Sequence, residues 1–241
     1  MKILLTEDGK KFFVKDPSKD FHSTFGFITS SDFKKKDGTI VQTNMGKKMT
    51  LASPTFMDRF EKIKRGPQII PLKDVGLIIA ETGLHKKSKV VDAGTGSGAL
   101  CFQLATIAKE VTSYEIREDF HGIAQENKKF LDLKNVKLKL ADVQKGIQEK
   151  KVDLATFDLP DPWNALPSAI RCLKVGGFLV SYSPTIPQVM DMVNALHQSK
   201  QFVILKTCEV MEREWEVEER KVRPKSQQIG HSGFLTFARK R

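Results

Sequence analysis

The stretch that most constrains the fold is KVVDAGTGSGAL at residues 89–100. It predicts a short buried strand, an acid at the end of that strand, a glycine-rich turn and a helix over residues 99–109. Glycines at every second position of the turn let the backbone bend sharply and approach a ligand closely, because no Cβ intervenes. Such a turn binds a nucleotide-like ligand outside the carboxyl end of a parallel strand. We therefore expect a nucleotide-binding α/β domain.

Composition excludes several classes of protein. The chain has 241 residues, of which 40% are apolar, enough for one large domain or a domain with a small companion. No apolar run reaches the roughly 20 residues that a membrane-spanning helix needs, and the N-terminus lacks the features of a signal peptide. The three cysteines, Cys101, Cys172 and Cys208, are spaced for neither a disulfide framework nor a zinc site. We expect buried thiols, no metal, no membrane association and a cytoplasmic location.

The charge of the chain points to a polyanionic partner. Forty Lys and Arg against 29 Asp and Glu leave a formal charge of +11, which favours nucleic acid over a merely solvated basic surface. Residues 1–66 hold fourteen Lys or Arg and eight Asp or Glu, over half of the excess. We expect this segment to contact RNA phosphates. Lysines that only keep hairpin tips soluble are the alternative.

Residues 1–66 are expected to form a small β-domain with a linking helix. Short β-rich runs predict a barrel or a curled sheet: residues 3–5, 11–15, 24–29, 39–43 and 47–51. Asp8-Gly9 and Asp37-Gly38 predict hairpin turns between strands.

The linking helix is predicted at residues 54–66. Ser53 is suited to cap its start, Pro54 to be its first residue and Gly66 to end it. Residues 67–241 then form the second domain.

The second domain alternates strands and helices. After a helix at residues 72–82, the pattern predicts strands at 89–94, 111–116, 136–142, 152–160 and 176–184, and helices at 99–109, 118–131, 164–173 and 187–198, with a short helix after 142. Two long β-runs, 202–220 and 233–240, predict an antiparallel pair at one sheet edge. The predicted fold class is α/β: a doubly wound, mostly parallel Rossmann-like sheet with an antiparallel edge strand, preceded by the small β-barrel-like domain.

Acids at the ends of successive strands bear on the ligand. GTGSGA at residues 94–99 also satisfies a dinucleotide fingerprint, so an NAD-dependent oxidoreductase is an alternative. However, Asp92 is expected to point into the mouth of the turn, where it would repel a pyrophosphate and attract the ammonium group of a methionine moiety. Glu115 is expected to bind both ribose hydroxyls, and Asp142 the adenine amino group. With Asp158 after the fourth strand, these acids favour S-adenosylmethionine.

The candidate cofactor-binding residues lie in the turn, at the strand ends and just before the first helix of the domain: Gln68, Asp92, Gly94, Thr95, Gly96, Ser97, Gly98, Ala99, Leu100, Glu115, Asp142, Val143 and Asp158. Gln68 is expected to reach the cofactor or the target base, with helix capping as the alternative. Asp158 opens the prolyl loop DLPDPW at residues 158–163, where an acceptor would meet the methyl group.

The motifs VVDAGTGSGAL, YEIRED, LADV and DLPDPW together resemble the class I methyltransferases. More narrowly, nearly the whole chain resembles the TrmI-type tRNA (adenine-N1)-methyltransferases. Similar stretches are DFHSTFG at residues 20–26, QII leading to Lys-Asp at 68–74, DLPDPW, and Arg-Pro followed by GHSGFL at 223–235. The chain departs from the family where Pro71-Leu72 replaces a tyrosine-proline pair, so any contact by that tyrosine is absent.

The resemblance implies methylation of N1 of a T-loop adenine in tRNA, of the adenine-58 type, in some members with the adjacent position, by a homotetramer. We expect Asp158 to be catalytic, orienting the base through its N6 amino group and favouring the developing positive charge. Candidate substrate or RNA contacts are Leu159, Pro160, Trp163, Arg223 and His231. Packing is the alternative for Trp163 and a structural hydrogen bond for His231. The remaining alternatives are methylation of another RNA or of an amino group, and a non-catalytic RNA-binding subunit.

Overall fold

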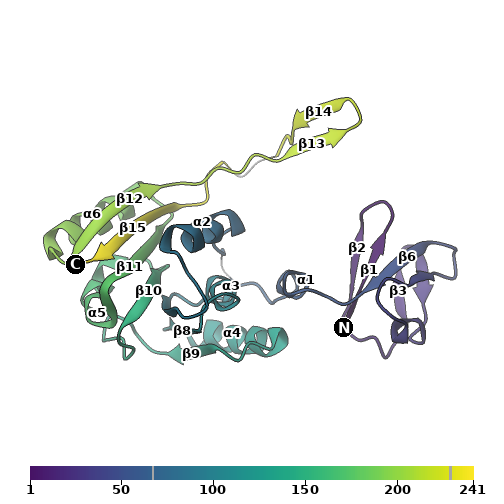
Figure 1. Cartoon of the computed structure of the whole chain (residues 1–241), viewed down its shortest axis with the longest axis horizontal. Helices are drawn as coiled ribbons and strands as arrows, with labels where there is room; N and C mark the ends of the chain where they lie inside the picture. The colour runs from purple at the N-terminus through teal and green to yellow at the C-terminus, as the bar shows by residue number, and fades with distance from the viewer. Residues whose placement is uncertain (67, 228–229) are drawn as a thin grey trace. The chain divides into compact units, whose positions relative to one another are not determined.

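Figure 1 shows a computed structural model of the chain, which describes residues 1–66, 68–227 and 230–241. The described residues divide into two compact units, Met1–Ile63 and Lys64–Arg241. Each unit has its own sheet and its own hydrophobic core. Within the described ranges, none of the helices is long and apolar enough to cross a membrane.

The first unit is built from short antiparallel strands. Its elements are β1 (Lys2–Thr6), β2 (Lys11–Val14), β3 (Phe21–Ser23), β4 (Gly26–Ile28), the 3-10 turn η1 (Asp32–Lys34), β5 (Ile40–Gln42) and β6 (Lys48–Ala52). The strands β2-β1-β6-β5 form one sheet, and β3 and β4 pair only with each other in the described part of the chain. Its core consists of Leu4, Val14, Ile28, Phe33, Val41, Met49 and Leu51.

The first unit combines this four-stranded sheet with a separate hairpin, and Gly26 explains why that hairpin forms. Its φ of +96° turns the chain back, so that Phe21–Ser23 and Gly26–Ile28 form a hairpin of their own. A Cβ on Gly26 would lie 2.2 Å from Oδ1 of Asn44, which accepts a hydrogen bond from the Phe27 N–H. The predicted run at residues 24–29 is therefore the second half of a hairpin.

Of the two predicted hairpin turns, one is confirmed. Gly9, with φ +79°, joins the paired strands β1 and β2. Asp37-Gly38 does not connect paired strands, because β5 pairs with β6 and not with the segment before it. Instead, the Asp37 carboxylate accepts hydrogen bonds from Lys2 Nζ (2.6 Å) and from the Ser53 N–H (3.0 Å).

The linking helix is shorter than predicted. Helix α1 spans Phe56–Phe60, and its N-cap is Thr55 rather than Ser53. The Thr55 Oγ1 accepts from the Asp58 N–H, and Asp58 Oδ2 accepts from the Thr55 N–H, which is a capping box. Because these reciprocal bonds satisfy two backbone donors, they set the start of the helix.

The second unit contains a seven-stranded sheet, as far as the described residues go, in the order β12-β15-β11-β10-β7-β8-β9. Its strands are β7 (Lys89–Ala93), β8 (Glu110–Glu115), β9 (Val136–Leu140), β10 (Val152–Phe157), β11 (Leu173–Ser183), β12 (Phe202–Cys208) and β15 (Phe234–Lys240). Strands β11, β10, β7, β8 and β9 are parallel neighbours, while β15 pairs antiparallel with both β11 and β12. The predicted doubly wound sheet with an antiparallel edge is confirmed.

The helices of this unit are α2 (Leu72–Thr82), α3 (Ala99–Ala105), α4 (Glu118–Leu131), η2 (Pro162–Ala165), α5 (Leu166–Cys172) and α6 (Ile186–Ser199). Helices α2 and α4 have the predicted bounds. Helix α3 ends four positions before the predicted 109, and residues 141–151 contain no helix, contrary to the short one expected there.

The predicted long strand at residues 202–220 is interrupted. Strand β12 ends at Cys208, and a separate hairpin follows, made of β13 (Trp215–Glu218) and β14 (Lys221–Pro224). Glu219 has φ +53°, the left-handed conformation that such a tight turn requires. We call residues 209–233, which carry this hairpin between β12 and β15, the hairpin connection.

The buried side chain of Asn127 in α4 predicts a measurable stabilising role. It accepts a hydrogen bond from the Lys64 N–H (2.8 Å) and donates to the carbonyls of Lys64 (2.8 Å) and Ser97 (2.9 Å). Asn127→Ala leaves these groups unpaired, so we expect the free energy of unfolding to fall by about 1–3 kcal/mol in urea titrations. Gln125→Ala, on the exposed side of the same helix, should change it by less than about 0.5 kcal/mol. Equal effects would contradict this role.

Candidate active site

Four acids follow neighbouring strands at one edge of the sheet. Asp92 lies in β7, Glu115 ends β8, and Asp142 and Asp158 follow β9 and β10. Because β10, β7, β8 and β9 are parallel neighbours in this order, their carboxyl ends lie along the same edge. The structure therefore brings together the strand-end acids that the sequence singled out.

The glycine-rich turn after β7 packs directly on the loop that begins with Asp158. The Asp158 N–H donates to the Ala93 carbonyl (2.9 Å), and a Cβ on Gly94 would lie 2.0 Å from the Asp158 carbonyl oxygen. Gly94 also has φ +91°. Only glycine allows this approach. Gly98 permits a second one, since its Cβ would lie 2.1 Å from the Phe102 ring.

Asp92 lies beneath the turn, not at its mouth as the sequence led us to expect. It is 1% exposed, and its carboxylate accepts hydrogen bonds from Ser113 Oγ (2.6 Å) and Thr156 Oγ1 (2.7 Å) on the adjacent strands. Ser113 gives its only proton to Asp92, so Thr95 Oγ1 is the donor in its 2.6 Å contact with Ser113 Oγ. This chain of hydrogen bonds explains how a buried carboxylate is tolerated.

The carboxylate of Glu115 connects the end of β8 to the glycine turn. Its Oε2 accepts from the Gly96 N–H (2.8 Å), and its Oε1 accepts from the N–H groups of Ile116 (2.9 Å) and Arg117 (3.0 Å). A carboxylate has about four acceptor positions, and three are used here. Glu115 can therefore accept one further hydrogen bond from a ligand hydroxyl.

Three of the four acids at this edge, Asp92, Glu115 and Asp158, repel one another. Burial, with a smaller contribution from the Glu115 charge, raises the pKa of Asp92 to about 6 against the opposing effect of hydrogen bonds from Ser113 and Thr156. Burial likewise raises the pKa of Asp158 to about 7, with added repulsion from Asp92 and Glu115. A cation bound at this edge would relieve the repulsion, and an anion would add to it.

Several groups at the edge are available to a ligand. Ser97 Oγ in the glycine turn is buried and has no hydrogen-bond partner in the described structure. Asp142 uses Oδ1 to accept from the Gln144 N–H (2.8 Å), while no described group bonds to its Oδ2. Beside them, the apolar side chains of Ile116 and Leu140 are exposed at the ends of β8 and β9. These groups fit an adenosine-like molecule that carries an amino acid: polar acceptors for its hydroxyl and amino groups and apolar flanks for its ring.

Ile116 was not among the predicted site residues. Its side chain is strongly apolar but 68% exposed. Exposure of such a side chain to water is unfavourable unless a ligand or partner covers it. A large apolar residue directly after a strand-end acid was the available signal in the sequence.

The acceptor side of the edge is formed by the loop after β10. Leu159 and Trp163 pack against the main core of the unit, so Trp163 lies behind the loop, the alternative role considered for it. The Pro160 carbonyl accepts from Gln188 Nε2 of α6 (3.0 Å), which anchors the outer part of the loop.

Other predicted site residues lie elsewhere. Val143 is buried in the core, and Gln68 is exposed just before α2. Arg223 lies in β14 and pairs across the hairpin with Glu216 (2.7 Å). His231 contacts Glu209 Oε2 (2.8 Å) and the Pro184 carbonyl (3.1 Å). No described contact joins Gln68 or Arg223 to the four acids.

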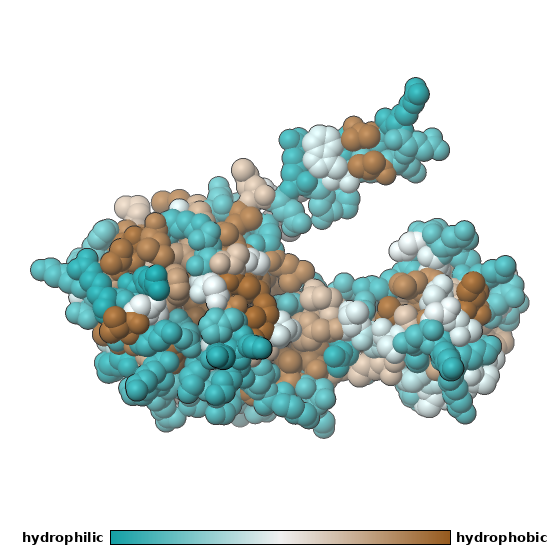
Figure 2. Space-filling view, in the orientation of Figure 1, coloured by the Kyte–Doolittle hydropathy of each residue, from teal (hydrophilic) through white to brown (hydrophobic). Residues whose placement is uncertain are grey.

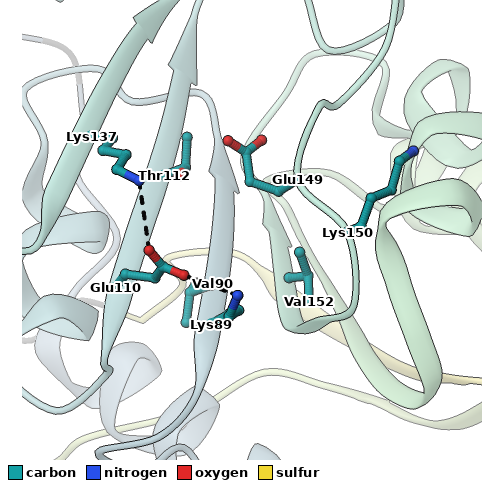
Figure 3. A pocket seen from close by; sticks show the side chains of 8 residues that line it. All are labelled: Lys89, Val90, Glu110, Thr112, Lys137, Glu149, Lys150 and Val152. Carbon is teal, nitrogen blue, oxygen red and sulfur yellow. Dashed lines mark ion pairs between the residues drawn. The ribbon is translucent and has the colours of Figure 1, made fainter.

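A cavity of about 110 Å³ lies at the opposite, amino end of the same strands. Figure 3 shows its lining residues, which come from the beginnings of β7, β8, β9 and β10 and from the loop before β10. Within it, Glu110 pairs with Lys89 (3.4 Å) and Lys137 (3.7 Å). In the described chain, no group of three or more acidic, histidine or cysteine side chains could hold a metal ion.

Comparison with known proteins identifies the family. The model of the family described as tRNA methyltransferase complex GCD14 subunit matches residues 61–226, more than half of the chain. The chain belongs to this family. The matched residues include the glycine turn and all four acids, so the site described above lies within the part of this tRNA methyltransferase that matches the family.

Two curated relatives cover most of this tRNA methyltransferase. It is 34% identical to the tRNA (adenine(57)-N(1)/adenine(58)-N(1))-methyltransferase TrmI of Methanocaldococcus jannaschii, over 99% of this chain and 94% of the relative. It is also 34% identical to the tRNA (adenine(58)-N(1))-methyltransferase TrmI of Thermus thermophilus, over 84% and 81% of the two chains.

Solved structures share the whole architecture. A SAM-dependent O-methyltransferase from Thermotoga maritima superposes with a TM-score of 0.88 and 31% identity, covering 99% of this chain and 92% of that one. The tRNA (m1A58) methyltransferase TrmI from Aquifex aeolicus gives a TM-score of 0.83 with 27% identity, covering 99% and 96%. Both units of the tRNA methyltransferase are included in these alignments.

The raised pKa of Asp158 predicts how stability depends on pH. The folded state keeps the proton up to about pH 7, whereas the unfolded chain releases it near 3.8. The ionisation of this group therefore lowers the free energy of unfolding as pH rises from about 4 to about 7. Asp158→Asn removes that loss, so in urea unfolding its stability relative to the unmodified chain should increase from about pH 4 to about pH 7. Asp161→Asn, an exposed acid of the same loop, is the control. A pH-independent difference for Asp158→Asn would rule out the raised pKa.

Proposed function

We propose that this tRNA methyltransferase transfers a methyl group from S-adenosylmethionine to N1 of adenine 58 in the T-loop of tRNA. The observation that carries the choice of cofactor is the crowding of Asp92, Glu115 and Asp158 at one edge of the sheet. A molecule with a sulfonium and an ammonium group relieves their repulsion, whereas the pyrophosphate of a nicotinamide dinucleotide would increase it. This argument also disfavours the oxidoreductase alternative.

In this proposal the cofactor is held by groups around the glycine turn. Glu115 accepts from the ribose, and Asp142 accepts from the adenine amino group through its available Oδ2. Ile116 and Leu140 flank the adenine ring, and Ser97 Oγ bonds the amino-acid part. Asp92 contributes mainly through its charge, since its oxygens are engaged beneath the turn.

When bound, S-adenosylmethionine would supply a methyl group on a cationic sulfur. The adenine N1 lone pair would form the new N–C bond while the C–S bond breaks, and the electron pair of the C–S bond would remain on sulfur. N1 of neutral adenine needs no prior deprotonation. The product ring is cationic, and its N6 proton becomes more acidic. Asp158 therefore accepts a hydrogen bond from the N6 amino group, stabilises the developing charge and takes up a proton. A pKa near 7 suits a group that exchanges a proton at neutral pH.

Support for the target comes from the relatives and not from the fold. The relative from Methanocaldococcus jannaschii, similar over nearly the whole chain, is named for adenines 57 and 58, and the one from Thermus thermophilus for adenine 58. The Thermotoga maritima structure of the same architecture is titled an O-methyltransferase. Overall architecture therefore leaves the acceptor open, and another RNA or another acceptor group is the second candidate.

The first unit offers a surface for tRNA phosphates. Lys34, Lys36 and Lys48 are exposed and form no ion pair with any described residue. Lys35 and Lys47 pair with Asp32 and Asp8, but exposed pairs contribute only about 0–1 kcal/mol, so a phosphate can replace the acid. Extracting a buried T-loop base costs a few kcal/mol, which such contacts would offset. In the hairpin connection, by contrast, Arg223 and its basic neighbours face acids of the other strand.

We further propose that the enzyme is a cytoplasmic homotetramer in which the hairpin connection forms subunit contacts. Figure 2 shows brown, hydrophobic side chains on the β13–β14 hairpin. Large hydrophobic residues are exposed along it: Met211, Trp215, Val217 and Val222. An isolated two-stranded hairpin is only marginally stable in water, and an apolar face of this kind favours a protein partner.

The methylation proposal predicts a specific modification. The purified chain is incubated with unmodified tRNA and methyl-labelled S-adenosylmethionine. The tRNA should become labelled and should give a reverse-transcription stop at adenine 58, and the same experiment shows whether position 57 also gives a stop. Asp158→Ala should reduce incorporation by at least about 100-fold, because general acid–base and charge-stabilising groups contribute 10²–10⁴. It should still bind S-adenosylhomocysteine in calorimetry.

Other outcomes separate the alternatives. Label at another nucleotide or on another RNA would keep the cofactor and replace the target. No incorporation with cofactor binding intact would support a non-catalytic subunit or a different acceptor, and binding of a nicotinamide cofactor instead would support the oxidoreductase. Asp161→Asn should retain activity, since this exposed acid of the same loop is not part of the proposed site.

The tetramer proposal predicts that the apolar hairpin face controls assembly. In sedimentation velocity, the unmodified chain should run at four times the mass of its 27.2 kDa chain. Trp215→Ser combined with Val217→Ser removes apolar area from the contact, so smaller species should appear. Val175→Ser, an equally exposed position at the other end of the sheet, should leave the assembly unchanged. A double variant that still sediments as a tetramer would exclude this face.

A further inference from the structure

Two motifs that lie far apart in the sequence meet in a buried hydrogen-bond network. Lys73 and Asp74, at the start of α2, contact Ser232, which lies just before β15. Lys73 Nζ donates to Ser232 Oγ (2.6 Å), and Ser232 Oγ donates to Asp74 Oδ2 (2.8 Å). Lys73 Nζ also lies 3.0 Å from Asp74 Oδ1. Asp74 is fully buried, and the Lys73 side chain is 8% exposed.

The same lysine holds the other end of the hairpin connection. Lys73 Nζ donates to the Val210 carbonyl (2.6 Å), two residues after β12 ends. The two ends are also joined to each other, since His231 Nδ1 lies 2.8 Å from Glu209 Oε2. Both points where residues 209–233 leave and rejoin the sheet are therefore fixed to the first turn of α2.

The network continues toward the candidate active site through Tyr182 of β11. The Tyr182 hydroxyl donates to the Ser232 carbonyl, and a Cβ on Gly233 would lie 2.4 Å from Tyr182 Cζ. Strand β11 is the neighbour of β10, with Ser181 opposite Phe157, so Tyr182 lies beside the end of the strand that Asp158 follows. Burial raises the pKa of Tyr182 to about 12, and smaller contributions from the charges of Asp74 and Asp158 agree with its position between them.

Burial of an ion pair is a poor way to gain stability. The desolvation of a lysine and an aspartate offsets most of their attraction, and apolar residues of similar size often stabilise as well or better. What such a network supplies is a defined geometry, because each donor and acceptor must keep its partner. Here the partners are the two ends of the hairpin connection and the wall of the site next to Asp158, by which we mean Tyr182 and residues 231–233.

We propose that Lys73, Asp74 and Ser232 are positioning residues that hold residues 231–233 and Tyr182 against the acceptor side of the site without touching the substrate. The inference rests on the proposed function, since that side of the site is where the target base binds. It also assigns a role to the two motifs, at residues 68–74 and 230–235, that the proposed chemistry does not use.

The test uses the full chain and the mildest change to the network. Ser232→Ala removes one hydroxyl and leaves the Lys73–Asp74 pair in place, while Ser232→Thr keeps a hydroxyl. Lys206→Met is the matched control, because Lys206 pairs with Glu81 (2.6 Å) and so also joins α2 to β12, but at an exposed position away from Ser232. Each variant is measured for kcat and KM with unmodified tRNA, for S-adenosylhomocysteine affinity and for backbone hydrogen exchange.

We expect Ser232→Ala to lower kcat on the order of tenfold or more, because a small displacement of the reacting groups strongly decreases the reaction rate. Its affinity for S-adenosylhomocysteine should stay within about twofold, and amides at residues 231–236 and 182–184 should exchange faster. Ser232→Thr should restore kcat and exchange, and Lys206→Met should alter neither.

Two results would overturn the inference. One is an unchanged kcat and unchanged exchange in Ser232→Ala, and the other is an equal loss of kcat in Lys206→Met, which would indicate a general effect of stability. If the unmodified chain fails to methylate tRNA, the proposed target is wrong, and hydrogen exchange alone then decides. Faster exchange at residues 231–236 and 182–184 in Ser232→Ala only would uphold the positioning role, and unchanged exchange would refute it.

Discussion

The repulsion among Asp92, Glu115 and Asp158 is the constraint on which the rest of the site depends. The parallel order of β10, β7 and β8 places these acids at one edge, where Asp92 and Glu115 are buried and Asp158 is partly buried, so that water screens them little. Asp92 is tolerated because Ser113 and Thr156 donate to it, and Glu115 because three backbone N–H groups do. The edge therefore has an excess of negative charge, which a cationic ligand would relieve.

The close packing of Gly94 on the Asp158 carbonyl connects the two halves of this site. One half is the turn that would hold the cofactor, and the other is the loop that would meet the acceptor. Since the two backbones touch, with no side chain between them, a shift of the turn must move the first residue of the loop. Cofactor binding and the placement of Asp158 are thus mechanically linked. The same contact explains why the first glycine of the turn has a role that is independent of any phosphate or ribose.

Features that depend on residues close together in the sequence were largely predictable. Contacts between residues far apart in the sequence were not. Helices α2 and α4, the central parallel strands and the strand-end acids follow from periodicity and turn residues, because each depends on a few neighbours in sequence. The capping box of Thr55 with Asp58 displaced the predicted start of α1, as two competing caps lay within three residues. The burial of Asp92 and the link from Lys73 to Ser232 depend on which strands become neighbours, across up to 159 residues. No local pattern contains that information, although the motifs that meet there were both visible.

The overall architecture of such a chain does not by itself decide which acceptor it methylates. Structures titled as an O-methyltransferase and as a tRNA (m1A58) methyltransferase share this architecture almost equally, with TM-scores of 0.88 and 0.83. What remains to distinguish acceptors is the wall beside Asp158, whose Tyr182 and residues 231–233 are fixed by a buried ion pair on α2. In the proposed site, the way in which this wall is held would determine which acceptor fits, while the strand-end acids would hold the cofactor.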